Sequence, residues 1–332
     1  MELLSLYRSM ARIRAFELAA EELSIGGVAV LGQKIDERAK IRGPLHGSIG
    51  QEGVAAGVCA HLVQDDLLTS SHRGHGHTLA KGADMKRMMA EMFGRRDGTN
   101  SGKGGSMHIA DFSVGMLGAN GIVGAGMAIA CGAAQAMKLR HKPNIVACFF
   151  GDGAVNRGPF LEALNWSCLF RLPVLFVCED NRWSSTSRTG ELTAGPGVVA
   201  RSVALGVPAE SVDGNDVEAV YELAKRLVGE IRAGDGPRLM HALTRRMHGH
   251  LSSDGQAYRD PVDIEIAARD EPMRLARKRL VEKRVPQVLI DRVNAEVEQE
   301  LQEALDFAEA SPVPPAADAF TDVQTVGAGT WY

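Results

Sequence analysis

Two short, nearly continuous apolar runs near the middle of the chain constrain its fold more than any other feature. They are NIVACFF, residues 144–150, and PVLFVC, residues 173–178. Such runs are typical of parallel strands that are buried on both faces of a sheet. The apolar side chains between the two runs recur at helical spacing, at Phe160, Leu161, Leu164 and Cys168. The sequence therefore predicts a strand, turn, helix, strand unit.

Further elements of the same kind lie on both sides of this unit. Residues 217–234 predict an amphipathic helix, and residues 236–243 predict another strand. Residues 118–139 form a glycine turn that leads into a helix rich in glycine and alanine, with no obvious strand in front of it. This small-residue helix fits either a buried subunit contact or tight packing within the fold. The alternation predicts a doubly wound, mostly parallel α/β domain over residues 1–268.

The composition turns to charged helices after about residue 269. One helical pattern carries an apolar stripe, formed by Leu289, Val293, Val297, Leu301, Leu305 and Ala308. The stripe predicts the docking face of a C-terminal helical extension over residues 269–332. The segment SPVPPAADAF, residues 311–320, cannot continue a helix, and we expect it to run over the surface as an arm.

Charge and cysteine content exclude some classes of function. A formal charge of -4 over 332 residues gives no basic field that would attract nucleic acid or an anionic membrane. No apolar stretch reaches the length of a membrane span. The five cysteines form no C-x-x-C pair, and several lie inside apolar runs, which predicts reduced thiols in a cytoplasmic protein. We expect small molecules and other proteins as partners.

The strongest functional signal follows the two predicted strands. Gly151, Asp152 and Gly153 come directly after the first strand, and Asn181 follows the second. Because the carboxyl ends of parallel strands meet at one edge of a sheet, Asp152 and Asn181 are expected to converge there. Carboxylate, amide and carbonyl oxygens suit Mg²⁺, and the glycines let the backbone approach phosphate groups. A GDG turn alone is nevertheless a weak motif.

Several further segments accompany these residues in order along the chain. They are HGSIGQEGVAAGVCAHL, SHRGHGHTLAKG, MMAEMFGRRDG, SGKGGSMHIAD, LGANGIVGAG, VDGNDVEAVYE, and HGH followed by YRDP. Together with GDG and EDN, they resemble the alpha subunit of the thiamine diphosphate-dependent dehydrogenase component of 2-oxo acid and acetoin dehydrogenase complexes. The acetoin type is the most similar, and the pyruvate type comes next. The resemblance implies the thiamine diphosphate-binding fold, with thiamine diphosphate and magnesium as cofactors.

The resemblance also implies roles for individual residues. The magnesium ligands are expected to be the side chains of Asp152 and Asn181 and the backbone carbonyl of Trp183. Gly153 and Ala154 are expected to lie along the diphosphate. The other cofactor-binding positions are His72, Arg73, Gly121, Val123 and His250. Histidine at position 46 matches the substrate channel, so that the implied catalytic residues are His46 and His250.

Histidine clusters in SHRGHGH and MHGH allow a second interpretation, because neutral imidazole is a common ligand of zinc. We prefer the interpretation in which Arg73 and a protonated or hydrogen-bonding imidazole hold phosphate. For His75, His77 and His248, bracing of the loops is the favoured role. Lys103 is expected to be structural.

The resemblance implies a two-chain enzyme that cleaves acetoin, or decarboxylates pyruvate or a related 2-oxo acid, and passes the acyl group to a lipoyl-bearing acyltransferase. The partner is a beta subunit, in an assembly of two alpha and two beta chains, and the beta subunit supplies the glutamate that activates the cofactor. Two alternatives stay open: a transketolase-like enzyme without a lipoyl partner, and a non-catalytic assembly subunit. A NAD-binding protein is disfavoured, because no obvious strand precedes GANGIVGAG and no acidic residue follows at the ribose distance.

Several positions depart from the family pattern. Residues 24–43 look longer than the usual connection and lead towards the substrate side. Asp180 replaces the more common asparagine, and His241 stands where an acid is usual. Arg245 replaces a tyrosine, and Leu251 replaces the serine that is phosphorylated in mitochondrial relatives. Substrate identity and phosphorylation control are therefore left open by the sequence.

Overall fold

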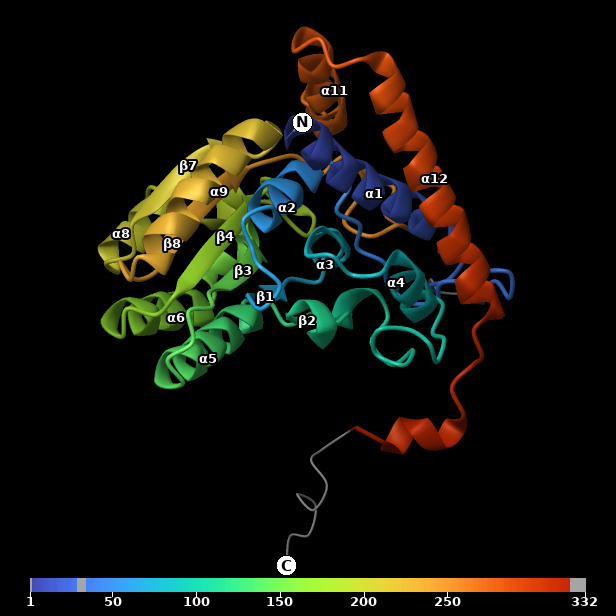
Figure 1. The fold of residues 1–332 in the computed structure, drawn as a ribbon, viewed down its shortest axis with the longest axis horizontal. Helices are drawn as coiled ribbons and strands as arrows, with labels where there is room; N and C mark the ends of the chain where they lie inside the picture. The colour runs from blue at the N-terminus through green and yellow to red at the C-terminus, as the bar shows by residue number, and fades with distance from the viewer. Residues whose placement is uncertain (1, 29–33, 323–332) are drawn as a thin grey trace, which may run out of the picture.

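A six-stranded parallel sheet forms the centre of the molecule in the computed structural model, which describes residues 2–28 and 34–322 (Figure 1). Every pairing within this sheet is parallel. The strands in sheet order are β2 (Met116–Ala119), β1 (Leu67–Ser70), β3 (Val146–Gly151), β4 (Val174–Asp180), β8 (Arg238–Leu243) and β7 (Ala209–Asp213). A small antiparallel hairpin of β5 (Trp183–Ser184) and β6 (Ser187–Arg188) follows β4.

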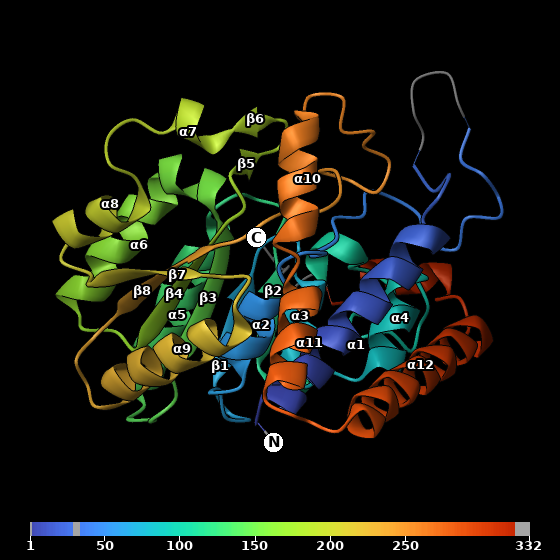
Figure 2. The ribbon, with the colours of Figure 1, turned by 90° about the horizontal axis from the view of Figure 1, so that it is seen from above.

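Strands β3 and β4 are apolar up to their last one or two residues, because their side chains alternate between two hydrophobic cores. Ala147 and Phe149 of β3 lie in the first core, and Val146, Cys148 and Phe150 lie in the second. Helices contributing to the first core include α1 (Glu2–Leu23), α2 (Glu52–Cys59), α4 (Met85–Met92), α9 (Val217–Arg232) and α12 (Gln287–Ala310). Those contributing to the second are α5 (Ala125–Leu139), α6 (Gly158–Leu169) and α8 (Val198–Ala204). The sheet is covered on both faces (Figure 2).

The remaining helices are short or belong to the C-terminal part. They are α3 (His75–Ala80), α7 (Thr189–Leu192), α10 (Pro261–Arg269) and α11 (Pro272–Glu282), with 3₁₀ turns η1 (Ser106–His108), η2 (Phe112–Val114), η3 (Asp152–Asn156) and η4 (Ala316–Phe320). Helix α12 packs on α1 and α4, and α11 packs on α1 and α2. The division at residue 268 stays a prediction, because α11 and α12 share a core with α1.

The structure confirms the predicted α/β fold with small shifts at the ends of elements. The strand, helix and strand of the central unit are β3, α6 and β4, and the two later elements are α9 and β8. The expectation that no strand lies in front of the glycine-rich turn is wrong, because β2 directly precedes the turn that leads into α5. This strand escapes recognition because it has four residues, includes Gly118, and lies at the edge of the sheet.

The C-terminal stripe is largely as predicted. Its buried members on α12 are Ile290, Val293, Val297, Leu301, Ala304 and Ala308. After α12, residues 311–322 run on as an arm that contains the 3₁₀ turn η4. All five cysteines are free. Within residues 2–28 and 34–322, every helix is too short or too polar to cross a bilayer.

The order of the strands fixes where a ligand can bind. Strands β1 and β3 are neighbours in the sheet, but the chain continues from β1 to β2 on one side and from β3 to β4 on the other side. The connections that follow β1 and β3 therefore diverge at the carboxyl ends of these two strands. In open α/β sheets, ligands bind in the crevice at such a switch point. The connections that begin at Ser71 and Asp152 border this crevice.

Candidate cofactor site at the carboxyl edge of the sheet

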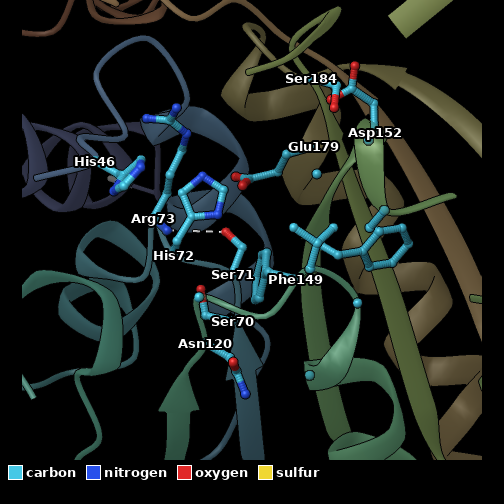
Figure 3. A pocket seen from close by; sticks show the side chains of 18 of the residues that line it. His46, Ser70, Ser71, His72, Arg73, Asn120, Phe149, Asp152, Glu179 and Ser184 are labelled. Carbon is cyan, nitrogen blue, oxygen red and sulfur yellow. Dashed lines mark hydrogen bonds between the residues drawn. The ribbon is translucent and has the colours of Figure 1, made fainter. Parts of the chain in front are cut away.

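A cavity of about 240 Å³ lies at this switch point. One water needs only about 10–15 Å³ by the same measure, so the cavity has room for part of a small organic molecule. Its walls come from the loops after β1, β2, β3 and β4, together with the segment before α2 and the loop around His250. In Figure 3, His46, His72 and Arg73 lie on one side, and Asp152 and Ser184 lie on the other.

The structure brings all of the sequence-predicted site residues to this one cavity. Those that line it are His46, His72, Arg73, Gly121, Val123, Asp152, Gly153, Ala154, Asn181, Trp183 and His250. They come from six separate stretches of the chain, so their convergence results from the parallel order of the strands. Sequence reasoning missed other lining residues, among them Gln51, Ser70, Asn120, Glu179 and Ser184.

Oxygen atoms gather at one end of the cavity, which we call the carboxylate end, defined by Asp152, Asn181 and Trp183. Asp152 is buried and accepts a hydrogen bond from the Thr189 hydroxyl. Burial, and then the negative charge of Asp180, raise the pKa of Asp152 to about 8. A bound cation would reverse this effect by stabilising the carboxylate. The Asn181 Oδ1 atom accepts from the Trp183 backbone N–H at 3.0 Å, which leaves a lone pair for another partner.

The opposite, histidine end consists of His46, His72 and His250 beside Arg73. The three rings pack edge to face, with centroids 4.6–5.7 Å apart. Burial, and then the charge of Arg73, lower the pKa values of His46 to about 3, of His72 to about 2 and of His250 to about 4. The rings are therefore neutral near pH 7, which favours a hydrogen-bonding imidazole over a protonated one.

These three histidines also bear on the zinc hypothesis. Their candidate ligand atoms lie within 4.8 Å of one another. However, the Arg73 Nη2 atom is 3.2 Å from His250 Nδ1, and the Arg246 Nη1 atom is 3.4 Å from the same nitrogen. Two guanidinium groups so close to the rings oppose a bound dication. The arrangement favours an anion or a neutral polar ligand.

Arg73 holds the loops of the histidine end together. Its guanidinium donates to the carbonyl of Gly47 at 2.5 Å and to that of His250 at 3.0 Å. Burial, and then the charge of Arg246, lower its pKa to about 10, so it stays protonated at neutral pH. Arg73 therefore supplies a fixed positive charge to the wall of the cavity.

The other histidines of the two clusters brace the loops, as expected. His75 Nδ1 lies 2.9 Å from Glu17 and its Nε2 lies 3.0 Å from the Ser106 hydroxyl. His77 is hydrogen-bonded to Ser70 and Glu179 and stacks on Phe149. His248 is paired with Glu21. The ring nitrogens of His75 and His77 are thus both engaged with protein and are not offered to a ligand.

A buried glutamate organises the loop that leads to this end. Glu91 of α4 accepts backbone N–H bonds at 2.7–3.1 Å from Asn100, Gly102, Gly104 and Gly105. The next residue, Ser106, contacts His75 and also accepts a bond from the backbone N–H of His46 at 3.4 Å. Lys103 in this loop binds Thr321 and Asp322 of the C-terminal arm, which fits its predicted structural role.

Two of the departures from the family pattern pair with each other. His241 Nε2 lies 2.9 Å from an Asp180 carboxylate oxygen, and its Nδ1 lies 3.0 Å from the Ser211 hydroxyl. Burial raises the pKa of Asp180, but the contacts with His241 outweigh it, so the net direction is downward. Asp180 and His241 are therefore matched replacements, and neither leaves an unpaired charge at the edge of the sheet.

The other departures lie outside the cavity wall. Arg245 is 3.7 Å from the carboxylate of Asp270. Residues 24–28 and 34–43 lie beside each other at the end of α1, since Gly43 donates to the carbonyl of Gly27 and Asp36 donates to that of Gly26. Residues 29–33 of segment 24–43 lie outside the described residues, so the expectation that this segment leads towards the substrate stays a prediction.

Comparison with known proteins supports a single family. Residues 33–317 match the family described as dehydrogenase E1 component. The chain is 40% identical over 319 residues to the alpha subunit of acetoin:2,6-dichlorophenolindophenol oxidoreductase from Bacillus subtilis, covering 96% of this chain and 92% of that protein. The protein of the same name from Cupriavidus necator is also 40% identical, over 97% and 93% of the two chains. The pyruvate dehydrogenase E1 component subunit alpha of Rhizobium meliloti is 34% identical, over 96% and 89%.

Proposed function

The chain belongs to the dehydrogenase E1 component family, and from this premise we propose that it is the alpha subunit of a thiamine diphosphate and Mg²⁺-dependent dehydrogenase. The enzyme cleaves acetoin, or decarboxylates pyruvate or a related 2-oxo acid. Family membership implies thiamine diphosphate and a beta partner. The magnesium ion and transfer of the acyl group to a lipoyl-bearing acyltransferase are parts of the proposal.

One observation carries the proposal. Oxygen ligands for a cation and a fixed guanidinium with neutral histidines line opposite ends of one cavity, at the switch point of the sheet. Asp152, Asn181 and the Trp183 carbonyl are proposed to hold Mg²⁺, with Gly153 and Ala154 beside the diphosphate. The residues present fit this group. A Cβ on Gly151 would meet open space, and His46 Nδ1 has no hydrogen-bond partner among the described residues.

The residues of the chain would bind and orient the reactants. Thiamine diphosphate, when bound, supplies the nucleophilic carbon and the electron sink. Arg73 holds the histidine loops in place, and neutral His46 and His250 are available to donate or accept a hydrogen bond at the substrate oxygen. A neutral imidazole can accept a proton without first losing one to solvent, and it can then return that proton.

An exposed apolar surface supports the two-chain assembly. Ile122 and Val123 line the cavity yet are 69% and 46% exposed. Further exposed apolar side chains lie on α5 and α6, at Ile129, Leu139, Leu161, Trp166 and Leu169. Exposed patches of this kind mark protein contacts. We propose that the beta subunit covers this surface and completes the cavity, in an assembly of two alpha and two beta chains.

The compartment is the last part of the proposal. All five cysteines are free, and four of them are buried. Burial raises the pKa values of Cys59, Cys131 and Cys148 to about 12, which keeps these thiols protonated and unreactive. Reduced cysteines are usual in the cytoplasm, which we propose as the location.

A titration of thiamine diphosphate with Mg²⁺ tests this function. The chain alone, the chain purified with its beta partner, and that complex with a metal chelator are compared by calorimetry. We expect tight binding by the complex, and loss of binding with chelator. Absence of binding in every form would refute the proposal and favour a non-catalytic assembly subunit.

The acyl acceptor needs a separate assay. We expect turnover of acetoin or pyruvate by the complex to reduce an added lipoyl domain. Turnover that joins carbon fragments without any lipoyl domain would favour the transketolase-like alternative.

A further inference from the structure

Gln51 has a buried amide group that the proposed cofactor site has not used. The residue directly precedes α2, lines the cavity and is 1% exposed. Its Oε1 atom accepts from Asn181 Nδ2 at 2.8 Å. Its Nε2 atom has no hydrogen-bond partner within the described part of the chain. A buried donor without an acceptor costs free energy, so its presence calls for an acceptor supplied by something else.

The orientation of this amide follows from its neighbours. The Trp183 backbone N–H can only donate, so the Asn181 atom that faces it must be the oxygen. The Asn181 nitrogen then faces Gln51, and the Gln51 atom opposite it must also be an oxygen. The Gln51 NH₂ group is thereby left for the cavity. Exchanging the two amide atoms of Gln51 would set two NH₂ groups against each other.

The backbone around Gln51 is held on both sides. The Gln51 N–H donates to the Ser48 carbonyl at 2.9 Å. Gly50 has φ +94, and a Cβ added there would lie 2.4 Å from the Arg245 carbonyl oxygen. The Gly50 N–H donates at 3.0 Å to Glu52, which is fully buried and paired with Arg14 at 2.5 Å. Gln51 therefore presents its amide from a fixed position.

We propose that Gln51 is a positioning residue of the carboxylate end that also binds the ligand directly. Its Oε1 atom holds Asn181 so that the Asn181 oxygen faces the proposed metal, and its Nε2 atom donates to an oxygen of the bound diphosphate. The inference rests on the proposed function and assigns a role to a residue outside the predicted metal and cofactor positions. Both roles act through one amide, so removal of the whole amide affects metal and cofactor binding together.

Two substitutions of Gln51 separate the roles. Gln51→Met has a similar size and loses both hydrogen bonds. Gln51→Glu keeps an acceptor for Asn181 but meets the diphosphate with a carboxylate. Gln299→Met, on an exposed site of α12, is the matched control. Each variant is purified with its beta partner, and thiamine diphosphate binding is titrated at a series of Mg²⁺ concentrations.

We expect Gln51→Met to weaken cofactor binding at least ~10-fold and to raise the Mg²⁺ concentration needed for half-maximal binding. Gln51→Glu should weaken cofactor binding by a similar factor while it shifts the Mg²⁺ requirement less. The cofactor-free complex of both variants should remain folded well above the assay temperature, as that of Gln299→Met does, although Gln51→Met leaves the Asn181 NH₂ group without its acceptor. This last result excludes a merely structural loss.

Wild-type affinity in both Gln51 variants would overturn the inference. A higher KM with unchanged cofactor affinity would also overturn it, because the amide would then face the substrate. The wild-type complex keeps this test separate from the test of function. Failure of the wild type to bind the cofactor refutes the proposed function, whereas wild-type binding with unaffected variants refutes only the role of Gln51.

Discussion

The carboxylate end and the histidine end of the cavity respond to burial in opposite directions. Burial beside Asp180 raises the pKa of Asp152 to about 8, whereas burial beside Arg73 lowers the pKa of His72 to about 2. Both shifts disfavour ionisation of the group. The two ends of the cavity are therefore suited to ligands of opposite charge. A cation would ionise Asp152, and an anion would favour protonation of the histidines.

The largest expected effect comes from removing the carboxylate. Asp152→Ala should abolish Mg²⁺-dependent binding of thiamine diphosphate, a loss of at least ~100-fold, because the charged ligand is gone while the histidine end is intact. Calorimetry of the complex with the beta partner measures the loss. Asp65→Ala, at an exposed carboxylate, is the matched control. Unchanged Mg²⁺-dependent binding would show that the metal lies elsewhere.

A smaller effect, on stability, is expected at Asp180 and His241, the two paired residues that depart from the family pattern. His241→Leu removes the partner of a partly buried carboxylate at Asp180, and should lower the free energy of unfolding by ~1–3 kcal/mol. Urea denaturation measures this change. His241→Gln keeps a donor and should recover part of the stability. Equal stability of the leucine and glutamine variants would mean that the Asp180 contact contributes nothing.

The histidine end should make stability depend on pH. His46, His72 and His250 have folded-state pKa values below the usual 6.5, so below about pH 6.5 the unfolded chain binds protons that the folded chain does not. Stability is therefore lost as the pH falls from about 7 towards 4. Asp152 acts with the opposite sign, since its folded form holds a proton between about pH 4 and 8.

His72→Gln tests this assignment. Proton uptake on unfolding at pH 5 should fall by about one proton, which urea denaturation at several pH values measures through the slope of stability against pH. His141→Gln, at an exposed position, should leave the slope unchanged. An identical slope in the His72 variant would mean that His72 titrates normally.

The smallest effect is expected at Trp183. Its proposed ligand atom is the backbone carbonyl, so Trp183→Phe should change Mg²⁺ affinity by less than ~3-fold. The aromatic contact with Tyr258, at 5.3 Å between ring centroids, can persist in the variant. Magnesium titration of the complex measures the change. A loss close to that of Asp152→Ala would show that the side chain itself supports the carboxylate end.

The sequence predicts the convergence of these residues because strand burial and motif order both follow from local patterns. The charge states do not follow in the same way. The pKa values of His46 and His72 depend on burial between loops that are distant in sequence. Gln51 was not predicted as a site residue, because a glutamine just before a helix is not by itself a pattern that indicates ligand binding. Its unpaired donor becomes visible only when Asn181 is seen to use the other atom.

The pairing of Asp180 with His241 is a second contact between residues distant in sequence that local patterns do not predict. Each residue departs from the family pattern, and as separate positions in the sequence the two departures weaken the resemblance. The register of the sheet places Cys178 opposite His241, which brings the imidazole within reach of the carboxylate at the end of β4. Two departures thus become one compensated contact. The contact could not be predicted because it depends on the register between β4 and β8, which local sequence patterns do not specify.

The packing of α12 on α4 bears on the order of events during synthesis. The methionines at positions 85, 88, 89 and 92 of α4 are buried in a core that includes Leu301, Ala304 and Ala308 of α12. Helix α4 also carries Glu91, which holds the loop that ends at Ser106 beside His75 and His46. On the ribosome, α12 emerges more than 200 residues after α4. The growing chain can assemble most of the sheet first, but this part of the methionine core and the loop anchored to it must wait for the last long helix to be translated.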